Sequence, residues 1–448
     1  MLVSHLRIMF LVSRQDFING SMPYNLTKTS QRGRHILMLK KKSSKYSISD
    51  KSVEFKNKIL FRIVAQKDFE TTSGEKVHAG DLGGWVESED NLSQEGTCWI
   101  FNEAEVSGSA KVSDNACIYD DARICGNAQV FDHAKIYSNV QVYDNARVFG
   151  QAEVLDNAEV YGNAELSGNA LACAHAHVYG NAKVSGDCRV FGDAKISGEV
   201  FGDAEISGDA KVLYPAKVFG SAKIMDAAIV HGGAQVSEGA KICGHSEVSG
   251  NAKIYGSAQV LDHAQISDNA AVYGKATIYS HAKVYGNAQV YEDAHIFFDA
   301  KVYGNAKIYG SAQVFDKAQV YGNASVSCDT NVYRKAQIYG YARIISSACI
   351  YDKAIVAGSA FVRDYAAIYG NARVSGQAEV SDYATIYGNA RVSGQAKVSA
   401  ESQVYGNANV YGDAEISGDA KIHGDAHICE CAKILVPADI QQGTYVSY

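Results

Sequence analysis

The sequence predicts an all-β protein, a single-stranded parallel β-helix of about 19 triangular coils with a small N-terminal β cap. The first observation behind this prediction is a six-residue unit that repeats through almost everything after residue 99. The second is that residues 368–378 recur unchanged as residues 386–396, so three units make one coil of eighteen residues. The third is a content of 41 Gly and 3 Pro, which is typical of tight turns and short strands.

The six-residue unit explains the shape of the coil. In the common run Ala-Lys-Val-Tyr, successive side chains alternate between faces, so Ala and Val point inward while Lys and Tyr point outward. Gly-Asn then makes the corner, because both residues tolerate positive φ. Three strands and three corners close a triangle, and the next coil stacks on it about 4.8 Å away. Each inward Val or Ile contributes about 1.5–3 kcal/mol of burial, so the rod needs no globular core.

The chain before the repeat divides into two parts. Residues 1–57 show no period and include a basic cluster, so we expect a disordered or loosely attached basic arm. Residues 58–99 contain a strand-like apolar segment and both tryptophans, Trp85 and Trp99. A stack of coils has an unpaired strand edge at its end, which a terminal unit must cover. We therefore expect residues 58–99 to form an N-terminal β cap, with both tryptophans packed on the first coil.

The hexapeptide-repeat β-helix occupies residues 100–440. Aliphatic residues fall at every sixth position up to Ile196, a single step of four residues leads to Val200, and the period then holds to Ile440. Residues 441–448 are expected to form a C-terminal tail. No insertion interrupts the period, so the predicted faces carry no long loops of the kind that build pockets.

Composition narrows the functional classes. The net charge of −7 gives no electrostatic reason to expect nucleic acid, and no apolar run approaches the ~20 residues of a membrane span. Arg7 interrupts the apolar N-terminal run, and no small-residue cleavage site follows it, so we expect no secretion signal. Most of the ten cysteines lack a partner eighteen residues away, which favours reduced thiols and a cytoplasmic protein.

Residues eighteen apart stack into columns along the rod, and one outward column is aromatic on eight successive coils. Its members are Tyr279, Phe297, Phe315, Tyr333, Tyr351, Tyr369, Tyr387 and Tyr405. Such a column stabilises a sheet by stacking between neighbouring strands. A flat aromatic strip of this length also marks a contact surface, here for a sugar chain or a partner rod, and we take these eight residues as the candidate binding surface.

Two corner columns carry polar residues. His245, His263 and His281 lie on successive coils and are a candidate metal site, although the lysines and asparagines later in this column favour a corner position that accepts any polar residue. The same column continues with Lys317, Lys335 and Lys353, a basic edge that an anion or solvent could meet. A second column, read as a structural ladder of side-chain amides, consists of Asn251, Asn269, Asn287, Asn305 and Asn323.

The segment with Cys173, His175 and His177 is the best place for a catalytic histidine. Its Cys-x-His-x-His spacing suggests a metal, but Cys173 and His177 lie on either side of a corner and therefore diverge. Glu159 and Asp193 lie one coil away, where a carboxylate could orient an imidazole. His175 and His177 are therefore the candidate catalytic residues.

The repeat pattern [VIL]-x-G-[ND]-A-x resembles that of the hexapeptide-repeat proteins, and this resemblance implies a left-handed coil. Within the cap, the motifs LGGWV at residues 82–86, NLSQEG at 91–96 and CWI at 98–100 are similar to the opening of the YdcK-type proteins. These are bacterial hexapeptide-repeat proteins described as acyltransferases of unproven activity. The resemblance brings no catalytic residue to a position in this chain.

Two functions follow from these observations. The first is a non-enzymatic rod-like scaffold or binding surface that presents the aromatic ladder and needs no cofactor. Its partners would be a polysaccharide, a protein or a second copy bound through exposed aromatic or apolar faces. The alternative, implied by the resemblance, is an acyl-CoA-dependent O- or N-acyltransferase with a histidine general base and acyl-CoA as co-substrate. In that family the site lies between subunits of a trimer and uses inserted loops, which this sequence lacks.

Overall fold

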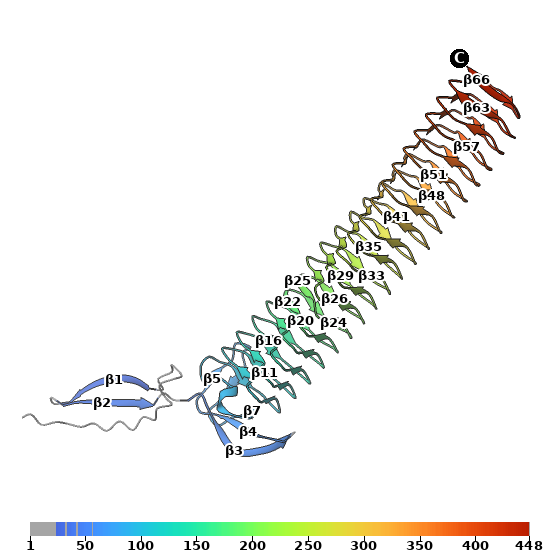
Figure 1. Ribbon diagram of the computed structural model, residues 1–448. Coiled ribbons are helices and arrows are strands. Elements are labelled where there is room, and N and C mark those ends of the chain that lie inside the picture. The colour runs from blue at the N-terminus through green and yellow to red at the C-terminus, as the bar shows by residue number, and fades with distance from the viewer. Residues whose placement is uncertain (1–23, 32–33, 42–43, 56, 448) are drawn as a thin grey trace, which may run out of the picture.

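The computed structural model describes residues 24–31, 34–41, 44–55 and 57–447, and it forms an elongated rod with a small β cap at its N-terminal end (Figure 1). The predicted all-β parallel β-helix is confirmed, with about 20 turns. In the described ranges the one helical element is the short 3-10 helix η1 (Glu89–Asn91), and no helix is long and apolar enough to cross a membrane.

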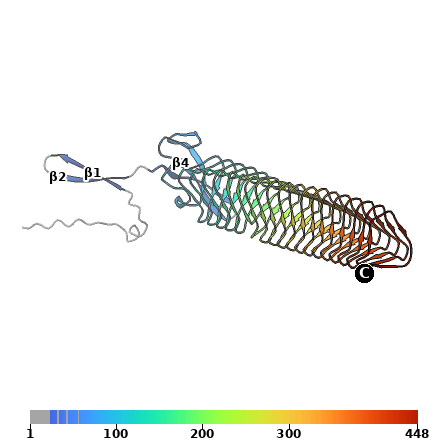
Figure 2. The same ribbon diagram turned by 90° about the horizontal axis from the view of Figure 1, so that it is seen from above.

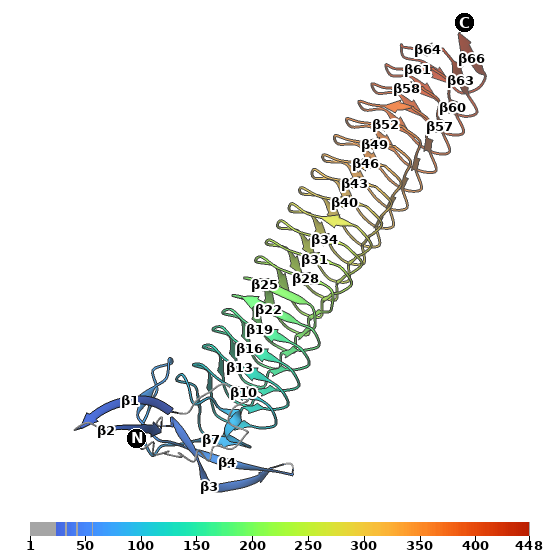
Figure 3. The same ribbon diagram turned by 60° about the vertical axis from the view of Figure 1, so that its left-hand side comes forward.

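Three parallel sheets form the faces of the rod. Face 1 runs from β8 (Trp99–Ile100) and β11 (Cys117–Ile118) to β65 (Asp439–Ile440). Face 2 runs from β9 (Glu105–Val106) and β12 (Arg123–Ile124) to β63 (His427–Glu430). Face 3 has 19 strands, from β10 (Lys111–Val112) and β13 (Gln129–Val130) to β64 (Lys433–Ile434), and Figure 3 shows these in line along one side.

The core is a column of small and aliphatic side chains enclosed by the three faces. Each short strand contributes one outward residue and one inward aliphatic residue, and the inward Ala, Val and Ile residues are 0% exposed almost throughout. The backbone N–H of one coil donates to the carbonyl of the next, as from Lys283 to Ala300 at 2.9 Å. Figure 2 shows the result, coils stacked in one continuous file from the cap to the C-terminal end.

The corners differ in one respect from expectation. Only the first of the two corner residues takes positive φ, as Gly370 does at 70° and Asp352 at 60°, whereas the Asn that follows Gly does not. Asp suits the first position because its carboxylate accepts the N–H of the equivalent residue one coil later, as Asp262 does from Ser280 at 3.0 Å. The predicted amide ladder is confirmed, with bonds of 3.0–3.3 Å from Asn251 through to Asn323.

The single four-residue step shortens one corner and leaves the stack intact. β22 (Lys183–Gly186) pairs with β25 (Glu199–Gly202), so that one coil has sixteen residues. Gly198 occupies the shortened corner, where an added Cβ would lie 2.7 Å from the carbonyl oxygen of Ala216. The eighteen-residue spacing resumes from β25 onward.

The cap begins earlier in the chain than predicted. β3 (Tyr46–Phe55), β4 (Lys58–Ala65) and β7 (Leu82–Val86) form an antiparallel sheet, and β7 pairs in parallel with β9, which extends face 2. The predicted boundary at residue 58 is therefore wrong. Tyr46 and the preceding Lys45 are each 1% exposed, and they anchor the start of β3 by donating to the carbonyls of Leu92 at 2.6 Å and Cys98 at 2.9 Å.

Part of the predicted N-terminal arm is also ordered as strands. β1 (Tyr24–Gln31) and β2 (Arg34–Lys41) pair antiparallel, so the arm is not wholly without structure. At the other end, β66 (Thr444–Ser447) pairs in parallel with β63. The predicted tail at 441–448 thus adds a strand to face 2.

The two tryptophans have different environments. Trp99 is 1% exposed and packs edge-on against Tyr46 and Phe69, whose β5 (Phe69–Glu70) pairs with β6 (Lys76–Val77). Trp85 instead lies on the outer side of face 2, where its indole N–H donates to Glu103 at 2.9 Å. Both tryptophans therefore contact the first coil, as predicted, but only Trp99 is buried, whereas Trp85 pairs with Glu105 on the outer side.

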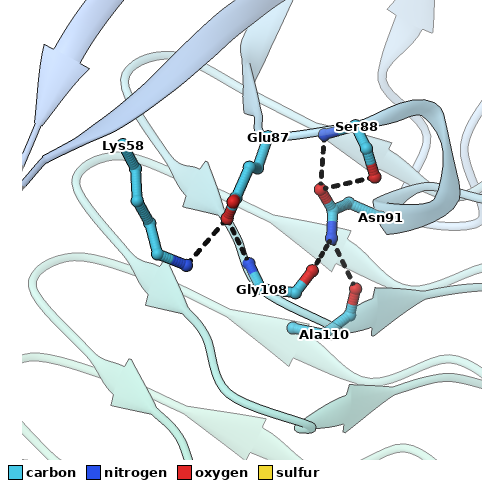
Figure 4. A network of polar contacts seen from close by, with 6 residues as sticks. All are labelled: Lys58, Glu87, Ser88, Asn91, Gly108 and Ala110. Atoms are coloured by element: carbon cyan, nitrogen blue, oxygen red, sulfur yellow. Dashed lines mark hydrogen bonds and ion pairs between the residues drawn. The ribbon is translucent and has the colours of Figure 1, made fainter.

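The cap satisfies the carbonyls at the open edge of the first coil, as Figure 4 shows. Backbone N–H groups of the cap reach Ala104 and Val106 on face 2. At the next corner the side-chain amide of Asn91 donates to the carbonyls of Gly108 at 3.0 Å and Ala110 at 2.9 Å. Glu87 completes the corner by accepting the Gly108 N–H at 2.6 Å and the Lys58 ammonium at 2.7 Å.

Candidate functional site

Three grooves lie along one edge of the rod, the corner that joins face 1 to face 2, which we call edge 1. The first covers coils near the cap, the second lies around Asp209, and the third covers the coils from Phe298 to Asn371. Both histidines predicted to be catalytic line the first groove, and the aromatic ladder runs beside the third.

The first groove, which we call the histidine groove, has a volume of about 380 Å³. Four successive coils each contribute one corner residue and one outward residue of face 2. The lining residues are Asp121, Arg123, Asn139, Gln141, Asn157, Glu159, His175 and His177. Cys173 and Asp193 are not among them, so the structure brings the two histidines together with Glu159 and leaves the cysteine on face 1.

His177 and Glu159 are direct neighbours on β21 (His177–Val178) and β18 (Glu159–Val160). His177 Nδ1 lies 3.5 Å from Glu159 Oε2, and it is a buried nitrogen without a hydrogen bond. Glu159 also accepts a hydrogen bond from the Tyr143 hydroxyl at 3.1 Å, and burial together with this carboxylate raises the pKa of Tyr143. A carboxylate beside Nδ1 favours the imidazole tautomer that carries its proton on Nδ1. In that tautomer Nε2 has a free lone pair and can accept a proton from a substrate.

The eight predicted ladder residues form one stack on face 1. Neighbouring ring centroids from Tyr279 to Tyr405 are 4.8–5.0 Å apart and the planes differ by 2–7°, and His423 extends the stack by one ring. Because each ring covers the face of the next, the ladder turns ring edges and hydroxyl groups outward. A sugar ring therefore cannot lie flat on these rings, in contrast to the flat strip that we expected.

The third groove, which we call the ladder groove, follows the same five coils as Phe297 to Tyr369 and has a volume of about 700 Å³. Its walls are the corner residues that come directly after the ladder residues in the chain. They are Phe298, Asp299, Asp316, Lys317, Arg334, Lys335, Asp352, Lys353, Gly370 and Asn371. The basic edge noted in the sequence thus forms a groove wall beside the ladder.

Sequence reasoning missed Phe298 and Arg334. Both occupy the first corner position, with φ of 56° and 59°, where Gly or Asp is usual. Positive φ is unfavourable for bulky side chains, and such strain clusters at functional positions. Among the described non-Gly residues with positive φ, Phe298 is the one aromatic and Arg334 the one cation. Their departure from the Gly-or-Asp rule was a signal that the sequence already contained.

The stacked histidines do not favour a metal site. The rings of His245, His263 and His281 lie nearly parallel with centroids 5.0–5.1 Å apart, so their nitrogens do not converge on one point. Over the part of the chain that the structure describes, no group of three or more His, Cys, Asp or Glu residues could hold a metal ion.

Comparison with known proteins agrees with the repeat. A family model described as the YdcK Beta solenoid repeat matches residues 264–280. A curated relative, the "Uncharacterized acetyltransferase YdcK" of Escherichia coli (strain K12), is 36% identical over 83 residues. This match spans 16% of the present chain and 24% of the relative's length. The predicted resemblance to YdcK-type proteins is thus confirmed, and the present chain is similar to them in its β-solenoid repeat.

Proposed function

We propose that this protein is a non-enzymatic rod-like scaffold whose aromatic ladder and adjacent groove form a binding surface for a polysaccharide or a protein. The observation that carries the proposal is that ladder and groove coincide. The rings from Phe297 to Tyr369 and the groove from Phe298 to Asn371 occupy the same five coils of edge 1.

The rod suits a repeated contact. Every coil is hydrogen-bonded to the next along all three faces, so positions along edge 1 keep a fixed spacing of about one coil height. The hydroxyls of Tyr333, Tyr351 and Tyr369 have no hydrogen-bond partner among the described residues and are therefore available to a ligand. A linear partner with a matching repeat would meet the same chemistry at each coil.

The test compares two ladders of the same protein. One variant carries Tyr333→Ser, Tyr351→Ser and Tyr369→Ser on face 1, and its control carries Tyr303→Ser, Tyr321→Ser and Tyr339→Ser on face 2. Ser occupies the same position in other coils, as at Ser207 on face 1 and Ser375 on face 2, so both variants should fold. Binding to an array of purified polysaccharides should be lost in the face 1 variant alone. Equal loss in both variants, or no binding by the parent protein, would contradict the proposal.

An acyl-CoA-dependent O- or N-acyltransferase is the second candidate, and the His177–Glu159 pair is the observation that favours it. The relative named an acetyltransferase gives it further support. In this reaction His177 Nε2 would accept the proton of a hydroxyl or amine as that group attacks the thioester carbonyl. The carbon–sulfur bond then breaks, and the thiolate of coenzyme A leaves and takes up a proton.

Calorimetry with acetyl-CoA tests this second candidate. If it is correct, the parent protein binds acetyl-CoA or transfers its acetyl group, His177→Gln removes transfer, and Glu159→Gln reduces it. His263→Ala, on the same edge but outside the histidine groove, is the matched control and should leave both unchanged. Absence of saturable binding at millimolar acetyl-CoA would exclude the acyltransferase candidate.

The same proposal extends to the winding of the coils, the location of the protein and its modes of contact. The hexapeptide pattern supports a left-handed winding of the coils, and the scarcity of cysteines with a partner one coil away supports a cytoplasmic location. The scaffold would act without a cofactor or nucleic acid, and self-association through exposed aromatic faces is a further mode of contact.

A further inference from the structure

The ladder groove has three cations that no carboxylate neutralises. Lys317, Lys335 and Lys353 lie on successive coils and are exposed, and none pairs with a carboxylate among the described residues. Their spacing along the rod is that of the adjacent rings, 4.8–4.9 Å. On three of its five coils, the wall of the groove is therefore a row of ammonium groups with one charge per coil.

Two of the three acidic residues of the same groove, Asp316 and Asp352, are engaged with the protein itself, and the third, Asp299, lies one coil before Lys317 in the same column. Asp316 accepts the backbone N–H of Arg334 at 3.1 Å. Asp352 accepts the backbone N–H of Gly370 at 3.2 Å and also pairs with the guanidinium of Arg334. These two carboxylates support the corner, whereas the lysines face the groove without such a role.

The aromatic ladder beside the lysines adds further groups that attract an anion, namely ring edges and tyrosine hydroxyls. Aromatic ring edges carry partial positive charge, and edges are what this ladder presents. Burial raises the pKa of Tyr333 and Tyr369, and raises that of Tyr351 to about 12, so the phenols remain protonated donors at neutral pH. The strip from the ladder to the lysines thus offers tyrosine hydroxyl donors on three coils and lysine ammonium groups on three coils, and the two sets share the coils of Tyr333 and Tyr351.

We infer that the ladder groove binds a linear, carboxylate-bearing polysaccharide that lies along edge 1. This inference rests on the binding function proposed above and names the class of ligand. The carboxylates would meet Lys317, Lys335 and Lys353, and the sugar hydroxyls would meet the tyrosine hydroxyls. A 1,4-linked pyranose is about as long as one coil is high, so successive sugars would meet successive coils.

Two other polyanions fit the groove less well. An extended peptide rises ~3.3 Å per residue, so its residues do not advance in step with the coils as 1,4-linked sugars do. Single-stranded nucleic acid binds by stacking its bases on aromatic faces, and here each interior ring face is covered by its neighbours.

Calorimetry on the full chain with three polymers tests the inference. Polygalacturonate supplies the acidic polysaccharide, its fully methyl-esterified form supplies the same chain without charge, and poly-L-glutamate supplies charge on a peptide. One variant combines Lys317→Gln, Lys335→Gln and Lys353→Gln. Its control combines Lys253→Gln, Lys307→Gln and Lys397→Gln on face 3, which changes the net charge equally and leaves the N-terminal basic residues in place.

We expect polygalacturonate to bind best and to bind about tenfold more weakly to the groove variant, the loss expected for three exposed ion pairs. The control variant should bind as the parent protein does, and added salt should weaken binding. Equal binding of poly-L-glutamate, or equal loss in both variants, would overturn the inference. If the esterified polymer binds more tightly than polygalacturonate, and this binding still depends on the face 1 ladder, the inference of an acidic ligand is wrong. The proposed binding function of the ladder would then still stand. Binding of no polymer would overturn this inference and the polysaccharide function together.

Discussion

The ring of Tyr333 lies flat against the ring of Tyr351, with 4.9 Å between the centroids and 7° between the planes. The same relationship repeats along face 1, so each ladder residue contributes both to the rod and to its surface. Separating these contributions requires variants that change stability and binding by different amounts.

Removal of an interior ring should cost more stability than removal of the first ring of the ladder. Tyr351→Ser loses two stacked neighbours and should lower the free energy of unfolding by about 1–2 kcal/mol. Tyr279→Ser, which loses the single stacked neighbour Phe297, should cost about half as much. Hydrogen exchange of the flanking strands measures both local effects. Equal protection in the two variants would show that stacking contributes little.

Replacement of Asn91 in the cap should lower stability more than replacement of a single exposed asparagine of the rod. Asn91→Ala leaves the carbonyls of Gly108 and Ala110 without donors and should destabilise the first coil by about 2–4 kcal/mol. Asn287→Ala, within the exposed amide ladder, is the control and should cost less than about 1 kcal/mol. Chemical denaturation compares the two variants, and a similar cost for both would contradict the role assigned to Asn91.

Alkaline pH should weaken the rod through its tyrosines. Burial raises the folded-state pKa of Tyr351 and Tyr291 to about 12, above the value near 10 of an unfolded chain. A raised pKa contributes stability that is complete below about pH 10 and is lost as pH rises toward about 12. Denaturation midpoints should therefore hold to about pH 10 and fall beyond it, and Tyr351→Phe should reduce the fall. Phenolate absorbance that titrates near pH 10 in the folded protein would contradict this prediction.

Arg334→Gly should separate binding from stability. Glycine removes the unfavourable positive φ, worth about 1 kcal/mol, while the lost exposed pair with Asp352 costs about as much, so the melting temperature should stay nearly constant. Binding in the ladder groove should weaken about threefold because one cation is lost. A clear loss of stability with unchanged binding would make Arg334 a structural residue.

The repeat was readable from the sequence because a strict period leaves few alternatives. Inward Ala and Val at fixed spacing specify the coil, and the columns of Asn251 and Tyr279 follow from it. The early start of the cap was hidden because Tyr46 is the one buried residue of β3, and the rest of the strand mixes apolar and polar residues that are exposed or partly exposed. Antiparallel pairing with β4 holds that strand, and no period in the sequence marks such a pairing.

The candidate sites were only partly predictable. The sequence placed Glu159 beside His177 from the eighteen-residue register, and the structure has them on paired strands. It did not indicate that ladder rings would present their edges, because ring orientation depends on stacking between coils. It also left Arg334 unnoticed, although an arginine at the first corner position departs from the Gly or Asp that is usual there, and φ of 59° shows what that departure means for the backbone.

A crystal structure of the protein soaked with an oligogalacturonate would show directly whether the ladder groove binds an acidic polysaccharide. Sugar density is expected along edge 1 from Phe298 to Asn371, with carboxylates within hydrogen-bond distance of Lys317, Lys335 and Lys353. Density on another face, or an empty ladder groove at a ligand concentration that saturates binding in solution, would contradict this expectation.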